Sequence, residues 1–210
     1  MSMRIRITFS KTSAMRYTSH LDLHRAWERT LRRAELPLAY SQGFNPRPKI
    51  NLASALPLGF TSESEVIDVR LEEELSLEKI APVLESALPP GLQVNQIYEV
   101  DLKAPVLQSQ LLASEIEITF LDPFADLEER VRTLLDAQEL PRERRGKAYD
   151  LRPLIEDLHL MSEDSDGCQR LFARLSAREG ATARPEEVVD ELGYDPLAAR
   201  VHRMRIIFQE

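Results

Sequence analysis

The sequence predicts an α+β protein built from two tandem ferredoxin-like (split βαβ) units with antiparallel sheets. Segments that alternate like strands and segments with the 3.6-residue spacing of helices follow one another in the order β-α-β-β-α-β. The same order occurs a second time over a similar length, after a polar stretch that contains proline. A chain of 210 residues is long enough for two such units.

The first unit is expected over residues 1–100. RIRITF near the N-terminus alternates with period two, which indicates a strand, and apolar residues at helical spacing around Trp27 follow it. Pro46 and Pro48 favour an extended loop, because proline disfavours helix at the residue before it. Ser76 has the position of an N-cap for a second helix. The expected elements are strands at 4–9, 50–58, 65–71 and 92–100, and helices at 20–34 and 76–88.

Residues 101–113 are expected to form a linker, and residues 114–210 the second unit. Asp122 and Pro123 have the cap-and-proline pattern of a helix start, and Gly193 has that of a helix end. The expected elements are strands at 115–121, 168–177 and 200–208, helices at 122–138 and 184–193, and within 141–160 a short strand together with a turn of helix. The units match in length and not residue by residue, which indicates a duplicated architecture.

The composition excludes several classes of protein. A hydrophobic content of 43% with 30% charged residues is typical of folded soluble chains. The apolar runs are far shorter than the roughly 20 residues of a membrane helix, and the N-terminus lacks the apolar block of a secretory signal. The single cysteine, Cys168, excludes an internal disulfide and an iron–sulfur cluster held by this chain alone. We therefore expect a cytoplasmic protein with no membrane partner.

Charge is distributed unevenly along the chain. Residues 1–60 hold ten Lys or Arg and three Asp or Glu, a formal charge of +7, although the whole chain carries −8. Residues 61–210 therefore carry −15. Such asymmetry indicates either a binding surface for a polyanion on an acidic body or two halves that attract each other.

The first helix begins with SHLD, residues 19–22. This motif has the form of a capping box, which by itself explains Ser19 and Asp22. His20 and His24 stand four residues apart on one helical face, which is the spacing of metal ligands. Candidates for the required third ligand are Asp22, His159, His202 and Cys168. None of them belongs to a metal-binding motif, so no metal site is expected, whereas a polar contact or proton transfer by His20 stays open.

A stripe of arginines follows the flank of the same helix, away from Trp27. Its members are Arg25, Arg29, Arg32 and Arg33. The planar guanidinium group suits bidentate contacts with phosphate, and each neutralised phosphate adds salt-sensitive affinity. The alternative is a solvated helix face, with or without salt bridges to Glu72, Glu73 and Glu74.

The loop at residues 40–49, YSQGFNPRPK, combines a glycine, two stiffening prolines, aromatic rings and cations. Tyr40 and Phe44 can stack on bases while Arg47 and Lys49 hold the phosphate backbone, as in readers of single-stranded RNA. The alternative places Phe44 in the core as a plug. A core plug does not explain Asn45 or Arg47, so we favour a functional loop.

A second basic cluster lies in the C-terminal half. It consists of Arg142, Arg144, Arg145 and Lys147. It is either a salt-bridged loop or a basic wall that faces the first helix across a groove between the units.

The stretch RYTSHLDLHRAWERTLRRAELPLAYSQGFNPRPKINLASALPLGFTSESEVIDVRL resembles the bacterial radical-SAM-linked family, a domain of unknown function. The resemblance extends over nearly the whole chain, including KAYDLRPLI and ARPEEVVDEL. It implies a companion of a radical-SAM protein, fused to it or encoded beside it, in an RNA or ribosome setting. This chain has no CxxxCxxC motif and no glycine-rich cofactor loop. The resemblance therefore places S-adenosylmethionine and the iron–sulfur cluster on the partner, and no cofactor on this chain.

The paired units are also similar in architecture to TruA-type tRNA pseudouridine synthases and to CRISPR repeat-processing endoribonucleases. The pseudouridine synthases need an aspartate in the loop after the first helix. This chain has Asn45 there and no acid between Glu35 and Glu63. That difference argues against pseudouridine synthesis.

These features favour a non-catalytic RNA-binding or substrate-presenting partner of a radical-SAM enzyme, acting in tRNA or rRNA modification or in ribosome-related metabolism. The expected nucleic-acid contacts are Arg16, His20, Arg25, Arg29, Arg32, Tyr40, Phe44, Asn45, Arg47, Lys49, Arg144 and Arg145. One alternative is an RNA-modifying or RNA-cleaving enzyme with the catalytic candidates His20, Asp22, His24 and Asn45. Another is a protein-binding adaptor whose basic face docks on an acidic partner.

Overall fold

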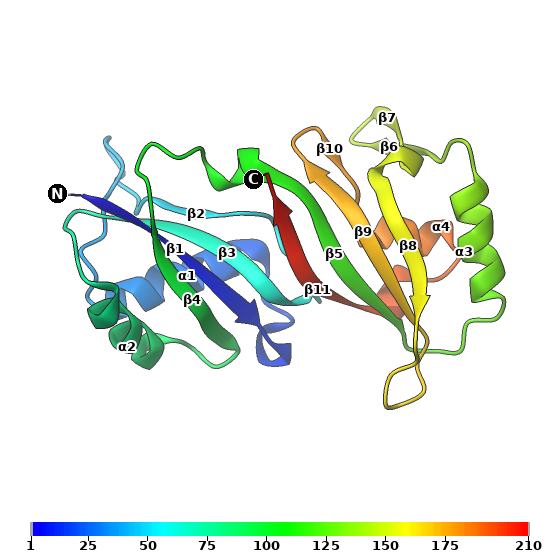
Figure 1. Ribbon diagram of the computed structural model, residues 1–210, viewed down its shortest axis with the longest axis horizontal. Coiled ribbons are helices and arrows are strands. Elements are labelled where there is room, and N and C mark those ends of the chain that lie inside the picture. Colours follow the sequence, from blue (N-terminus) through cyan, green and yellow to red (C-terminus); the bar gives the residue numbers. More distant parts are fainter. Residues whose placement is uncertain (1, 210) are drawn as a thin grey trace. The chain divides into compact units, whose positions relative to one another are not determined.

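The computed structural model describes residues 2–209 and divides the chain into two compact units, Met1–Gln110 and Leu111–Glu210. Each unit contains a mostly antiparallel sheet and two α-helices, so the chain is an α+β protein (Figure 1). The division falls inside the expected linker at 101–113. Residues 101–110 belong to the first unit, called unit 1, and the first strand of unit 2 begins at Leu111.

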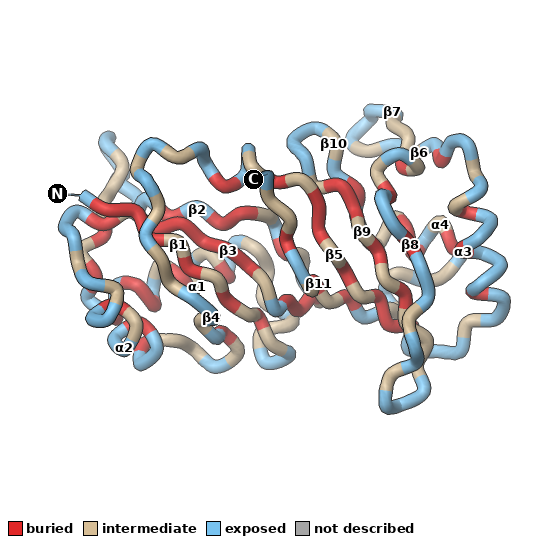
Figure 2. Tube along the Cα trace, in the orientation of Figure 1, coloured by how far each residue is buried: buried red, intermediate tan, exposed pale blue. Residues whose placement is uncertain are grey.

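Unit 1 has an antiparallel sheet with the strand order β4-β1-β3-β2. Its strands are β1 (Met3–Lys11), β2 (Ile50–Leu52), β3 (Thr61–Leu71) and β4 (Leu92–Val100). Side chains alternate between the faces of a strand, and along β1 the residues Ile5, Ile7 and Phe9 are completely buried. Figure 2 shows the buried segments along β1 and β3. The predicted alternation of RIRITF is thus confirmed, and it identifies the face of β1 that packs on the helices.

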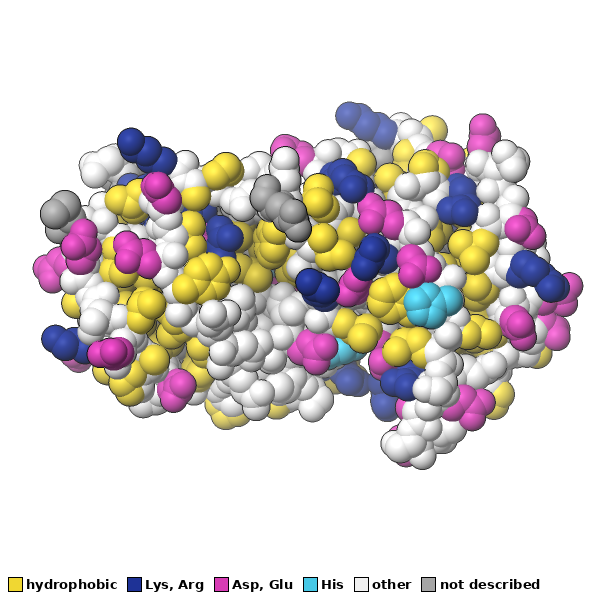
Figure 3. All heavy atoms as spheres, viewed as in Figure 1, with side chains coloured by type: hydrophobic (Ala, Val, Ile, Leu, Met, Phe, Trp, Pro, Cys, Tyr) yellow, Lys and Arg dark blue, Asp and Glu magenta, His cyan; other side chains and the backbone are white. Residues whose placement is uncertain are grey.

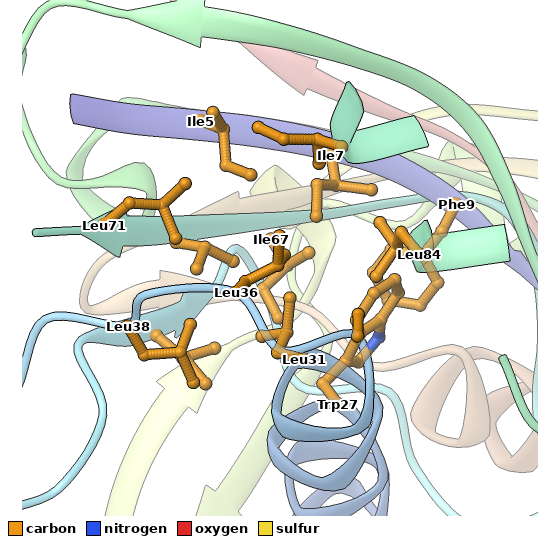
Figure 4. Packing of buried hydrophobic residues seen from close by; sticks show 14 of the residues in the cluster. Ile5, Ile7, Phe9, Trp27, Leu31, Leu36, Leu38, Ile67, Leu71 and Leu84 are labelled. Atoms are coloured by element: carbon orange, nitrogen blue, oxygen red, sulfur yellow. The ribbon is translucent and has the colours of Figure 1, made fainter. Parts of the chain in front are cut away.

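Two helices cover this face, α1 (His20–Arg33) and α2 (Leu77–Ala87). Trp27 and Leu84 come from the two helices and pack with Ile7 and Phe9 of β1 (Figure 4). The rings of Phe9 and Trp27 meet edge to face with centroids 4.7 Å apart. The buried positions of α1 follow 3.6-residue spacing, which leaves its other flank exposed. The predicted helices at 20–34 and 76–88 are confirmed to within one residue at each end.

The second predicted strand, at 50–58, is wrong beyond Leu52. The chain leaves the sheet after Ala53 and turns back through residues 54–60 into β3, which begins at Thr61. Pro57 has no N–H for a strand ladder, and Gly59 has φ +88°, a conformation suited to a turn. These two residues explain why the strand ends early, although the apolar composition of residues 50–58 favours a longer one.

The segment that leads into α1 is held by a buried lysine. Lys11 is completely buried at the end of β1. Its Nζ donates to the carbonyl oxygens of Thr18 at 2.9 Å, Phe60 at 3.0 Å and Arg16 at 3.3 Å. An ammonium group has three N–H donors, and here each has a backbone acceptor. Lys11 therefore fixes the start of α1 against the start of β3.

The residues that follow β4 are fastened to unit 1. Asp68 on β3 is buried and accepts from Arg4 Nε at 3.0 Å and from Arg6 Nε at 2.7 Å. The same Arg4 donates from its terminal nitrogens to the carbonyl oxygens of Ala104 at 2.7 Å and Pro105 at 3.0 Å. Within the predicted linker at 101–113, a buried guanidinium group therefore fastens residues 104 and 105 to β1.

Gly91 should be the least replaceable glycine of unit 1. It has φ +95°, and a Cβ atom would lie 2.6 Å from Met15 Cγ and 3.0 Å from Met15 N. We expect Gly91→Ala to lower the free energy of unfolding by about 3 kcal/mol, since it adds a clash to backbone strain. Gly180→Ala is the control, because Gly180 also has positive φ but has open space around its Cβ position. Equal losses in urea denaturation would show that the contact with Met15 does not matter.

Unit 2 repeats the pattern with the strand order β11-β5-β9-β8, in which every neighbouring pair is antiparallel. Its strands are β5 (Leu111–Phe120), β8 (Ile155–Met161), β9 (Arg170–Arg178), β10 (Ala181–Thr182) and β11 (Ala199–Phe208), and its helices are α3 (Leu127–Asp136) and α4 (Pro185–Glu191). The predicted helix at 122–138 is wrong at its start. Asp126 is left-handed, with φ 59°, and α3 begins only after it.

Between α3 and β8 the structure has a β-hairpin that the sequence did not predict. It consists of β6 (Pro141–Arg144) and β7 (Lys147–Asp150). Arg145 and Gly146 form its two-residue turn with φ values of 54° and 75°, as a type I′ turn requires. The region 141–160, in which one short strand was expected, therefore contains β6, β7 and most of β8. No helix within residues 2–209 has both the length and the apolar composition that crossing a membrane requires.

Candidate nucleic-acid interface

A groove of about 480 Å³ lies between α1 and the loop at residues 41–49, within unit 1. Its lining residues are Leu21, His24, Arg25, Glu28, Arg32, Pro46, Arg47, Pro48 and Ile50. The five from α1 stand at helical spacing and so form one stripe beside the buried face of the helix. The SHLD helix and the GFNPRP loop, which the sequence singled out separately, therefore line one groove.

The loop is closed by backbone hydrogen bonds at its base. Ser41 N donates to Arg47 O at 2.9 Å, and Lys49 N donates to Ala39 O at 2.8 Å. Ser41 Oγ accepts from Arg47 N at 3.0 Å, and Pro48 is buried beneath the loop. These contacts hold the backbone of Arg47 beside α1 and leave the tip at residues 42–45 in solvent.

Phe44 lies at this tip with its side chain fully exposed, at 101%. The alternative interpretation of Phe44 as a core plug is therefore wrong. Tyr40 is half-buried and packs against the core of unit 1, so it supports the loop. Asn45 is exposed beside Phe44. The tip thus offers one exposed aromatic ring and two exposed amides, those of Gln42 and Asn45.

The ten cations of residues 1–60 fall into three groups. Arg4 and Arg6 pair with Asp68, and Lys11 is buried, so these three serve the fold. A second group is exposed and makes no ion pair within residues 2–209: Arg29, Arg32, Arg47 and Lys49. No ion pair joins α1 to Glu72, Glu73 or Glu74 among the residues described, and the exposed arginines still agree with the alternative of a solvated helix face. The exposed group leaves unit 1 with free positive charge around the groove.

The third group consists of three arginines whose side chains are partly constrained, Arg16, Arg25 and Arg33. Arg25 pairs with Asp22 at 3.1 Å in an exposed i, i+3 contact, which is weak in water. Arg16 precedes α1, and its Nε is buried without a hydrogen-bond partner among the residues described. Arg33 turns away from the groove and donates to Ala87 O at 3.3 Å.

The four catalytic candidates do not meet in the groove. Of His20, Asp22, His24 and Asn45, only His24 lines it. Ser19 Oγ accepts from Asp22 N at 3.2 Å and donates to Asp22 Oδ2 at 2.7 Å, so this part of the capping box forms. The bond from Ser19, assisted by Arg25, lowers the pKa of Asp22. The described chain also contains no group of three His, Cys, Asp or Glu that could hold a metal ion.

Two of the four cations in the basic cluster of unit 2, Arg142 and Arg144, pair with acids of α4. Arg144 pairs with Glu187 at 2.6 Å, and Arg142 pairs with Glu191 at 2.5 Å and with Asp190. Burial opposes the charged form of Glu187, but hydrogen bonds from Arg144 and Tyr149 lower its pKa below the ordinary value. Arg145 stays exposed at the hairpin turn. The cluster thus matches the salt-bridged alternative at Arg142 and Arg144.

The sheet of unit 2 is neutralised in the same way. Figure 3 shows Lys and Arg side chains intermixed with Asp and Glu over β5, β8 and β9. The pairs include Arg170–Glu117 and Arg178–Glu156, at 3.1 and 2.7 Å. A polyanion therefore finds no uniform positive surface on this face of unit 2.

Unit 2 has a hollow of its own, of about 520 Å³, which the sequence analysis did not predict. The rings of Phe120 and Phe124 line it together with Asp122, Glu163 and Asp166. Burial and neighbouring carboxylates raise the pKa of the Cys168 thiol at its edge. The lining contains no cation, so this hollow is unsuited to a polyanion.

A family model matches residues 4–185, and its description reads "Uncharacterized protein conserved in bacteria (DUF2344)". The chain belongs to this family. Both the SHLD helix and the GFNPRP loop of this DUF2344 protein lie inside the matched region. No curated protein matches the chain significantly.

Comparison with solved structures finds one chain similar in fold to this DUF2344 protein at a TM-score above 0.5, among those described here. A chain from the crystal structure of a Cbf5-Nop10-Gar1 complex has a TM-score of 0.52 at 11% identity, covering 98% of this chain and 50% of that one. A chain from the archaeal box H/ACA sRNP Nop10-Cbf5 complex has 0.47 at 12%, covering 98% and 49%. An unknown protein from Galdieria sulphuraria has 0.28 at 13%, covering 99% of both chains. The protein thus spans about half the length of the Cbf5-complex chains. At 11% identity, its similarity to the chain from the Cbf5-Nop10-Gar1 complex concerns the fold alone.

The residues expected at the site did not include two groove residues of α1, Leu21 and Glu28, or three residues from the loop side, Pro46, Pro48 and Ile50. The two residues of α1 could have been identified by their spacing from His24 and Arg25, because residues three and four apart share a helical face.

Proposed function

We propose that this protein is a non-catalytic RNA-binding module and that the groove between α1 and the GFNPRP loop is its contact surface. The observation that carries the proposal is the convergence of Arg25, Arg32 and Arg47 on one groove, of which Arg32 and Arg47 have no carboxylate partner within residues 2–209. Guanidinium groups without internal partners can hold phosphate oxygens in bidentate contacts. Phe44 at the loop tip adds a ring on which an unpaired base can stack.

The proposal extends to a radical-SAM enzyme as the partner that modifies the bound RNA, a tRNA or an rRNA. It rests on the resemblance of the SHLD and GFNPRP motifs to the radical-SAM-linked family. S-adenosylmethionine and the iron–sulfur cluster would be bound by that partner. The proposed architecture is a tandem of ferredoxin-like units, supported by the equivalent strand orders β4-β1-β3-β2 and β11-β5-β9-β8.

Alanine variants of the groove test the RNA-binding proposal. Arg32→Ala and Arg47→Ala should each weaken the binding of tRNA or rRNA fragments about 10-fold, because each removes a charged hydrogen-bond donor from the phosphate contact. Affinity is measured by fluorescence anisotropy at one fixed salt concentration. Circular dichroism checks that each variant folds.

Arg29→Ala is the matched control for these variants. Arg29 is an exposed arginine of the same helix that does not line the groove, so its removal changes net charge equally. It should weaken binding less than about 3-fold through long-range electrostatics alone. Equal effects of Arg29→Ala and Arg32→Ala, or no RNA binding by the wild type, would refute the groove as the RNA site.

A further inference from the structure

The groove contains charges of both signs that do not neutralise each other. Glu28 lies in its lining with Arg25, Arg32 and Arg47. Within residues 2–209 the only ionic neighbour of the Glu28 carboxylate is His24, at 3.9 Å between Oε1 and Nδ1. Arg25 pairs with Asp22 instead. The side chain of Glu28 is 26% exposed and lies in the lining of the groove.

A carboxylate in this place weakens the binding of a bare phosphate, because like charges repel in a partly enclosed site. A ligand that uses both kinds of group must carry an anion and also N–H donors. An RNA nucleotide has both, since its phosphate is anionic and its base edge can donate. The geometry therefore points to contact with a base at Glu28 beside phosphate contacts at Arg32 and Arg47.

We propose that Glu28 recognises an unpaired guanine, and that the groove therefore prefers single-stranded RNA with an accessible guanosine. This inference rests on the proposed RNA-binding function and adds a base preference to it. Guanine presents two adjacent donors, N1–H and the N2 amine, on its Watson–Crick edge. The two oxygens of a carboxylate can accept both bonds at once.

The other bases fit a carboxylate less well. Adenine and cytosine each present one amine next to an acceptor nitrogen, which repels the second oxygen. Uracil presents one N–H between two carbonyl oxygens, so it should be the weakest. Hydrogen bonds on base edges are the usual source of sequence preference in single-stranded RNA. Phe44 is exposed in the loop that carries Arg47. Its ring favours a nucleotide over a peptide as the ligand, because it offers a stacking surface to a neighbouring base.

Uridine oligonucleotides with one central guanosine, adenosine, cytidine or uridine test this preference. In anisotropy titrations the guanosine strand should bind the wild type about 10-fold more tightly than the all-uridine strand. A central inosine, which keeps N1–H and lacks the N2 amine, should recover only about 3-fold of that gain. Glu28→Gln should reduce the guanosine preference below about 2-fold. It should also raise the affinity for the all-uridine strand, because one negative charge leaves the groove.

Glu78→Gln is the control, since Glu78 is an exposed acid of α2 in the same unit and does not line the groove. It should keep the full preference. Equal binding of all four strands by the wild type would overturn the guanine assignment while leaving RNA binding intact. Displacement of the guanosine strand by a dipeptide but not by guanosine monophosphate would overturn it in favour of a peptide ligand. Absence of binding to these strands and also to tRNA would overturn both proposals.

Discussion

Replacing Asp68 with alanine is expected to lower the free energy of unfolding by about 3–5 kcal/mol. Asp68 is buried between Arg4 and Arg6, and Arg4 is itself only 3% exposed. Without the carboxylate, a buried guanidinium group keeps its charge and loses its counter-ion. The loss should appear in urea denaturation followed by circular dichroism.

Two further variants separate this ion-pair effect from a general effect of substitution. Asp101→Ala removes an exposed acid after β4, and it should change the free energy of unfolding by less than about 1 kcal/mol. Adding Arg4→Met to Asp68→Ala should recover part of the stability, because it removes the uncompensated charge. A loss below about 1 kcal/mol for Asp68→Ala would show that the buried network contributes little.

Truncation of Trp27 should have an effect of similar size. Trp27 is completely buried between α1 and β1, where its ring meets Phe9, so Trp27→Ala should cost about 3–5 kcal/mol by leaving a large cavity. Trp27→Phe should cost less than about 2 kcal/mol. The indole Nε1 has no hydrogen-bond acceptor among the described residues, so phenylalanine leaves no polar group newly unpaired.

Circular dichroism is the suitable probe for these variants, because Trp27 is the only tryptophan and its fluorescence is lost with it. Equal losses for Trp27→Phe and Trp27→Ala would contradict the packing account. That result would mean that the indole N–H makes a bond that stabilises the fold.

The local patterns predicted most of the elements because periodicity reports burial. RIRITF and the spacing around Trp27 identify the buried faces of β1 and α1 without any knowledge of their partners. Long-range contacts were not predictable in this way. Residues 101–113 have the composition of a linker, which does not predict that Arg4, about 100 positions earlier in the chain, binds the carbonyl oxygens of residues 104 and 105.

The site was predictable in its parts and not in its geometry. The sequence identified Arg32 and Arg47 as phosphate-binding candidates, but only the fold places them on one groove and leaves Arg29 outside it. The sequence also predicted Arg144 as a nucleic-acid contact. In the structure the unpredicted hairpin β6–β7 brings Arg144 to Glu187, and the two side chains form an ion pair. Charge counts cannot tell free cations from paired ones, because the pairing depends on contacts between distant segments.

The salt dependence of RNA affinity tests the central claim, that Arg32 and Arg47 hold RNA phosphates, most directly. A plot of log K against log salt concentration should be less steep for the double variant Arg32→Ala/Arg47→Ala than for the wild type, by about 1.4–1.8 in slope, since two phosphate contacts and their counter-ion release are lost. Identical slopes for the two proteins would contradict the account, because they would mean that neither guanidinium group neutralises a phosphate in the complex.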